Sequence, residues 1–123
     1  MKSPPPSKNQ ASQRQLRVGE EIRHALAEVM LDISFLDTRL AGVSVTVSQV
    51  QAAPDLRYAN VYVIPLGLSG EEAEKVVRAL NDHAKHLRHE VDRRVRLKFS
   101  AALKFIYDTS LDTAARLEEL LKS

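Results

Sequence analysis

Cysteine and tryptophan are absent from the 123-residue sequence, and aromatic residues make up only 5% of it. Without cysteine the chain has no disulfide, no thiolate metal ligand and no thiol nucleophile. Scarce aromatic residues leave little for a base-stacking platform, so contact with nucleic acid is expected to use phosphates and shape. The sequence also lacks an apolar signal core and any apolar run that could cross a bilayer, so we expect a cytoplasmic protein without a membrane partner.

The composition that remains is typical of a globular protein, with 44% apolar and 28% charged residues. This length is enough for one domain with a hydrophobic core. The net charge is only +2, so the positions of the cations, and not their total, must indicate a polyanionic partner. Residues 1–12 contain three consecutive prolines among polar residues, which predicts a disordered tail, and residues 13–123 form the predicted domain.

Periodic apolar residues predict a first helix and then a β-hairpin. Helical spacing runs from Gln13 to Ile33. Valine alternates with serine and threonine from Val43 to Val47, and a slip in that alternation indicates a β-bulge near Ser48 or Gln49. A second strand, rich in β-branched and aromatic residues, is predicted from Tyr58 to Ile64.

A long amphipathic helix is predicted after Ser69, because Ser69 and Glu72 match the S-x-x-E capping box. Its apolar stripe steps by threes and fours without a break through Ala73, Val76, Val77, Leu80, Ala84, Leu87, Val91 and Val95. A third strand is predicted over Ala102–Tyr107 and a last helix over about 110–121. This order predicts an α+β two-layer sandwich, in which helices cover one face of a three-stranded sheet.

Cations gather at the end of the long helix and just after it: Lys85, Arg88, Arg93, Arg94, Arg96 and Lys98. Arginines in the last turn of a helix can simply complement its macrodipole, which accounts for part of this cluster. That effect fades beyond the last turn, so Lys85, Arg88 and Lys98 need another explanation. We interpret the cluster as a surface for RNA phosphates.

Other motifs are weaker indications of function. His83, His86 and His89 are spaced by three, so their side chains diverge around a helix and do not converge on a metal ion. The segment 67–70 spells G-x-x-G, but it joins a strand to a helix, whereas a KH domain has this backbone clamp between two helices. Since no nucleophile elbow, phosphate loop or carboxylate pair is present, we expect no metal, no cofactor and no catalysis.

Several short motifs together resemble the ribosome-binding factor A family. They are Arg14-x-x-Arg17-Val18, Asp55-Leu56-x-x-Ala59-x-Val61-Tyr62-Val63, Ala79-Leu80-Asn81, Leu87-Arg88, Arg96-Leu97 and Phe105-x-Tyr107-Asp108-x-Ser110. The resemblance implies a type II KH-like fold of order αββααβ. It also implies a non-enzymatic assembly factor that binds the free 30S small ribosomal subunit and aids late maturation and processing of 16S rRNA, often with a role in cold adaptation.

The sequence departs from this family pattern in two places. The family typically has an Ala-x-Gly kink between its two central helices, where this sequence has His83-Ala84-Lys85. Together with the unbroken apolar stripe, that difference favours a nearly continuous helix, while a kink imposed by tertiary packing stays open as the alternative. A proline common before the third strand is replaced by Ala101.

The sequence thus predicts a monomeric KH-like RNA-binding factor without a small-molecule substrate. The residues expected to bind rRNA are Lys85, Arg88, His89, Arg93, Arg94, Arg96 and Lys98, with Arg14 and Arg17 as a second basic patch. Two alternatives stay open. One is a protein-interaction module whose basic face binds an acidic partner, and the other is a small α+β enzyme, which a deep pocket with perturbed titratable groups would reveal.

Overall fold

The computed structural model describes residues 11–98, 100–110 and 118–121. The elements follow in the order α1 (Gln13–Val29), η2 (Met30–Asp32), η3 (Thr38–Leu40), β1 (Val45–Ala52), β2 (Tyr58–Pro65), α2 (Gly70–Asp82), α3 (Ala84–Arg94) and β3 (Ala102–Tyr107). The disordered tail predicted for residues 1–12 lies almost wholly outside the described residues. The predicted last helix falls largely on residues 111–117, which also lie outside them, while residues 118–121 are helical.

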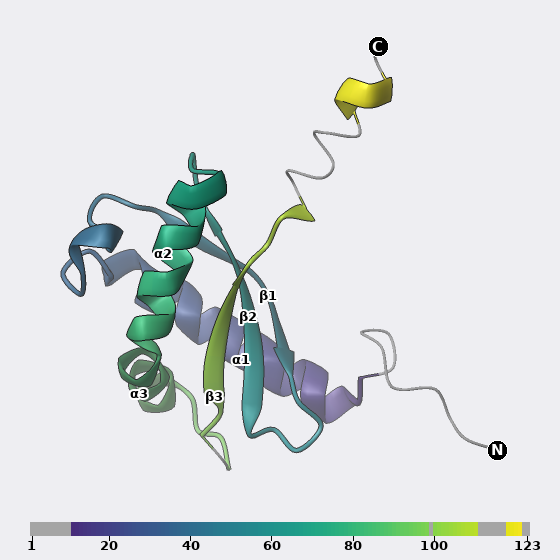
Figure 1. Cartoon of the computed structure of the whole chain (residues 1–123). Coiled ribbons are helices and arrows are strands. Elements are labelled where there is room, and N and C mark those ends of the chain that lie inside the picture. Colours follow the sequence, from purple (N-terminus) through teal and green to yellow (C-terminus); the bar gives the residue numbers. More distant parts are fainter. Residues whose placement is uncertain (1–10, 99, 111–117, 122–123) are drawn as a thin grey trace.

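The sheet has the strand order β1-β2-β3, with β1 antiparallel to β2 and β2 parallel to β3. The register shifts between Val47 and Gln49, which confirms the predicted bulge. In Figure 1, α1 crosses behind the strands, while α2 and α3 pack against β3 at the edge of the sheet. The predicted α+β architecture and the order αββααβ are therefore confirmed.

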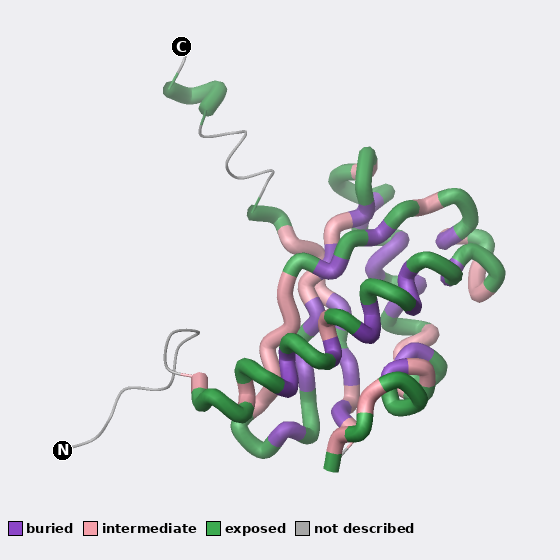
Figure 2. Tube along the Cα trace, turned by 180° about the vertical axis from the view of Figure 1, so that it is seen from behind, coloured by how far each residue is buried: buried purple, intermediate pink, exposed green. Residues whose placement is uncertain are grey.

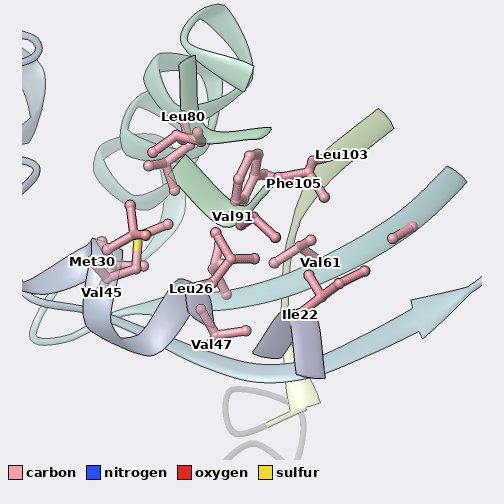
Figure 3. Close-up of a cluster of buried hydrophobic side chains, with 14 of the residues drawn as sticks. Ile22, Leu26, Met30, Val45, Val47, Val61, Leu80, Val91, Leu103 and Phe105 are labelled. Carbon is pink, nitrogen blue, oxygen red and sulfur yellow. The ribbon is translucent and has the colours of Figure 1, made fainter. Parts of the chain in front are cut away.

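The hydrophobic core lies between the sheet and these helices (Figure 3). Along β2, Val61 and Val63 are fully buried while Asn60 is exposed, as expected for a strand with one face on the core. Along α1 buried positions recur every three or four residues, and Figure 2 shows buried and exposed positions interspersed along this helix. The largest fully buried side chains include Phe105, Ile22, Leu26, Ile33, Leu40, Leu80 and Leu87.

The start of α1 is held by a capping box that the sequence analysis did not identify. The Ser12 hydroxyl accepts a hydrogen bond from the Gln15 backbone N–H at 3.1 Å, and the Gln15 side chain accepts one from the Ser12 N–H at 2.9 Å. Gln15 also donates its amide N–H to the Ala52 carbonyl oxygen at 3.0 Å, which ties α1 to the end of β1. Ser12 thus belongs to the folded domain and not to the predicted tail.

The predicted capping box at Ser69 is wrong in its chemistry, although the helix does begin there. Ser69 is the N-cap of α2, but its side chain makes no capping hydrogen bond. Gly70 has φ +56°, a left-handed conformation at the position where a capped helix has its first helical residue. Helix α2 therefore begins at a left-handed glycine without a capping hydrogen bond from the Ser69 side chain.

The prediction of one nearly continuous helix after Ser69 is also wrong. The helix breaks at His83, where φ is −105° and ψ is 18°, and α3 then ends at Arg94. Tertiary packing explains the break, because Leu87 and Val91 of α3 are buried and α3 contacts both α1 and β3. The His83 Nε2 atom also lies 3.0 Å from the Asp37 Oδ2 atom in the α1–β1 connection.

Candidate nucleic-acid interface

Cations from two distant parts of the sequence meet around one open cleft of about 160 Å³. Arg14 and Arg17 come from the start of α1, and Arg96 and Lys98 come from the segment between α3 and β3. The β1–β2 turn and the α3–β3 segment lie at the same, lower end of the sheet in Figure 1. The structure thus places Arg14 and Arg17, the second predicted patch, beside Arg96 and Lys98, the last two cations of the predicted α3 cluster. The cleft is lined by Arg14, Arg17, Val18, Glu21, Leu56, Arg96, Leu97 and Lys98.

The positions of the α1 cations cannot be explained by helix stability. Arg14 lies in the first turn of α1, where the helix macrodipole disfavours positive charge and no acidic residue is present, and Arg17 follows in the next turn, where the macrodipole offers it no stabilisation. In the described part of the chain, neither of them nor Arg96 forms a hydrogen bond or an ion pair, and all three are exposed. These charges are therefore available to an anionic partner.

The floor of the cleft is apolar and rests on an unusual turn. Leu56 has φ +62°, the only non-glycine residue with positive φ among those described, and this conformation costs about 1–2 kcal/mol. Its N–H donates to the Ala53 carbonyl oxygen at 2.9 Å, and the next N–H, of Arg57, donates to the Asp55 Oδ1 atom at 3.0 Å. The turn leaves the Leu56 side chain 7% exposed beside Val18 in the cleft.

Arg88, a predicted rRNA-binding residue, is engaged inside the fold. Its Nε–H donates to the Ser100 hydroxyl at 2.6 Å, and its Nη2 atom donates to the Ser100 carbonyl oxygen at 3.0 Å. The Ser100 hydroxyl in turn donates to the Asp92 carboxylate at 2.5 Å. Arg88 therefore fastens α3 to the segment that enters β3.

The two arginines in the last turn of α3 are also paired. The Arg94 guanidinium donates to a Glu90 carboxylate oxygen at 2.9 Å and lies 3.7 Å from the Glu28 carboxylate of α1. Arg93 pairs with Glu90 at 3.2 Å. The hydrogen bond from Arg94, with the charge of Arg93, holds the pKa of Glu90 below its usual value. Lys85 and His89 are exposed on α3, away from the residues that line the cleft.

A family model matches nearly the whole folded region. The model for ribosome-binding factor A matches residues 14–121. The chain belongs to the ribosome-binding factor A family. A family member from Phenylobacterium zucineum is 52% identical over 109 residues, covering 89% of this chain and 74% of the relative. Another, from Bradyrhizobium diazoefficiens, is 48% identical over 112 residues, covering 91% of this chain and 76% of the relative.

Solved structures of ribosome-binding factor A have the same KH-like fold. The crystal structure of the Thermus thermophilus protein matches with a TM-score of 0.61 at 28% identity, covering 76% of this chain and 94% of that one. A homology model of the Thermus thermophilus protein, fitted into the cryo-EM map of a complex of 30S with ribosome-binding factor A, matches with a TM-score of 0.62 at 25% identity, covering 77% of this chain and 96% of that one. The resemblance and the KH-like fold predicted from the sequence are thus confirmed.

Other features considered in the sequence can be located on the described residues. Among the described residues, no three histidine or acidic side chains are grouped so that they could hold a metal ion. None of the described helices is both long and apolar enough to cross a membrane. Gly67–Gly70 connects β2 to α2, as the sequence predicted. The sequence does not identify the other residues of the cleft, because only the tertiary structure brings α1, the β1–β2 turn and the segment after α3 together. These residues are Val18, Glu21, Leu56 and Leu97.

Proposed function

We propose that this protein binds the free 30S small ribosomal subunit and assists late maturation and processing of its 16S rRNA without catalysing a reaction. Membership of the ribosome-binding factor A family supports this function, as does the likeness to a Thermus thermophilus protein in a 30S complex. The observation that carries the proposal is the convergence of Arg14, Arg17, Arg96 and Lys98 around one cleft.

The cleft cations are proposed to be the main contacts with rRNA phosphates. Cations that stay hydrated and unpaired in the free protein release counterions from RNA without first losing an internal partner. Arg14, Arg17 and Arg96 meet this condition. Lys85, His89 and Arg93 are exposed on α3 and are proposed to flank the contact. Arg88 and Arg94 are proposed to contribute mainly by holding α3 in place.

Cosedimentation with purified 30S, 50S and 70S particles tests this proposal. The double variant Arg14→Glu/Arg17→Glu should lose association with 30S, and its fold should persist because negative charge is favoured at a helix N-terminus. The matched control is Lys75→Glu/Arg78→Glu, which makes the same charge change at the same spacing on the exposed face of α2. Loss of 30S binding in both variants, or in neither, would contradict the assignment of the cleft.

A basic surface could instead bind an acidic protein, and the same particles distinguish the two. Binding to rRNA should disappear when the particles are treated with ribonuclease before sedimentation. Binding to a protein partner should resist that treatment and survive with the stripped ribosomal proteins. Nuclease-resistant association would replace the proposed function with a protein-interaction module.

A further inference from the structure

The cleft combines features that a surface for phosphates alone does not need. It has an apolar floor formed by Val18, Leu56 and Leu97, and a carboxylate, Glu21, among four cations. A phosphate groove gains nothing from buried leucine and is weakened by a nearby negative charge. Resting on the proposed function, we propose that this cleft holds one unpaired guanine of single-stranded RNA, with its flanking phosphates on the surrounding cations.

The size and the floor of the cleft favour a single base. A volume of about 160 Å³ accommodates one flat ring system and excludes a duplex. Val18 and Leu56 are 6% and 7% exposed, so core packing fixes the base of the cleft, and the half-buried Leu97 adds the more accessible apolar surface on which the face of a base can rest. Bases splayed out of single-stranded RNA are recognised by stacking on aromatic or arginine side chains and by hydrogen bonds to the exposed edge. In this cleft Arg14, Arg17 or Arg96 can supply the stacking plane above the apolar floor.

Glu21 supplies the selectivity for guanine. Arg14, Arg17, Val18 and Glu21 share one face of α1, because they are separated by three, one and three residues. Glu21 forms no ion pair with the described cations, Arg17 included, so both of its carboxylate oxygens can accept hydrogen bonds. Guanine presents two adjacent donors on its Watson–Crick edge, N1–H and N2–H. Adenine, cytosine and uracil each place an acceptor beside a single donor, which a carboxylate repels.

Binding of short RNAs measured by fluorescence anisotropy at low salt tests the proposal. The probes are the heptamers UUUGUUU, UUUAUUU and UUUUUUU. The wild-type protein should bind UUUGUUU about tenfold more tightly than UUUAUUU, the discrimination expected of one bidentate contact. Equal affinity for the three heptamers, or no binding of any of them, would overturn the guanine site.

Two variants assign the preference to Glu21. Glu21→Gln should bring the affinities for UUUGUUU and UUUAUUU within about twofold of each other, since an amide cannot accept both hydrogen bonds. It should also bind UUUUUUU more tightly than wild type, because a negative charge has been removed. The control Glu28→Gln makes the same change at an exposed position elsewhere on α1 and should keep the preference for guanine. A preference that survives in Glu21→Gln would overturn the role of Glu21.

The outcome is separable from that of the proposed function. Cosedimentation of the wild-type protein with 30S particles tests the proposed function on its own. Association with 30S without a preference among the heptamers would refute only the guanine site. Failure to associate with any ribosomal particle would refute the proposed function, whatever the heptamers show.

Discussion

Gly19 allows α1 to lie directly against the backbone of β1. A Cβ atom at this position would lie 2.7 Å from the Val50 carbonyl oxygen, closer than two such atoms can approach. The contact falls just beyond the bulge between Val47 and Gln49, where β1 bends. From the sequence this glycine is only a weak point in a helical pattern, since the atom it must accommodate belongs to a strand much later in the chain.

Gly19→Ala should therefore destabilise the protein, although alanine favours the helical conformation. The gain in helix propensity is about 1 kcal/mol, and the forced displacement of a packed backbone costs about 1–3 kcal/mol. We expect a net loss of unfolding free energy in urea titrations. The control Ala27→Gly, at an exposed position of the same helix, should lose about 1 kcal/mol through propensity alone. A more stable Gly19→Ala protein would show that α1 can move away from β1.

Whether each arginine is paired within the fold was only partly predictable from the sequence. The cluster from Lys85 to Lys98 was evident, but whether each cation is paired depends on residues that are distant or in loops, such as Glu28 and Ser100. Arg14 and Arg17 are only two charges on a helix with an ordinary sequence pattern, so the sequence alone gives weak support for a binding role. In the structure neither pairs with a described residue, and both lie near the N-terminus of α1. Helix stability therefore does not explain them, which favours a role in binding an anion.

At the scale of elements, charged side chains in the connection between α1 and β1 contact the residues at which α2 ends and α3 begins. The Asp37 carboxylate accepts hydrogen bonds from Arg39 at 2.7 and 3.0 Å and lies 3.0 Å from the ring of His83. Arg39 also pairs with Asp82, the last residue of α2, at 2.8 Å. This group of charges fixes the residue at which α2 ends and α3 begins.

The stabilisation from Asp37 should disappear in acid. The hydrogen bonds from Arg39, followed by the one with His83, hold the pKa of Asp37 well below its ordinary value. A carboxyl with a lowered folded-state pKa stabilises the protein above its unfolded pKa of about 3.9, and that contribution is lost as the pH falls further. The urea midpoint of wild type should exceed that of Asp37→Asn at pH 7, and the difference should shrink steadily between pH 4 and pH 2.5. A difference independent of pH would contradict this role.

The elements themselves were largely predictable, and the errors have physical causes. The strands and α1 followed from periodicity because each has one face on the core. The stripe from Ala73 to Val95 does not show whether the helix is straight or broken, because its apolar spacing runs past His83 without interruption. What decides between them is the contact of α3 with α1 and of His83 with Asp37, and neither contact is local in the sequence.

At the scale of the whole molecule, folding creates the candidate site. The start of α1, the β1–β2 turn and the segment after α3 are separate in the chain and meet at one end of the sheet. Sequence patterns identify the cations and the fold family. They do not show that an apolar floor and a carboxylate accompany those cations, since Val18 and Leu56 look like ordinary core residues.

The salt dependence of 30S binding should report the number of cations that contact RNA phosphates. If Arg14, Arg17, Arg96 and Lys98 each contact one phosphate, the logarithm of the association constant should fall with the logarithm of salt concentration with a slope of about −3 to −4. Arg14→Gln/Arg17→Gln should reduce the magnitude of that slope by about 1.5–2.

Arg88→Gln provides the contrast that separates binding from stability. It should leave the slope unchanged, because Arg88 is engaged with Ser100, and instead lower the unfolding free energy by about 1–2 kcal/mol through loss of those hydrogen bonds. Isotherms at several salt concentrations, measured beside thermal unfolding of each variant, provide both quantities. If Arg88→Gln reduced the slope and Arg14→Gln/Arg17→Gln did not, the RNA would contact α3, and the cleft would not be the main phosphate-binding surface.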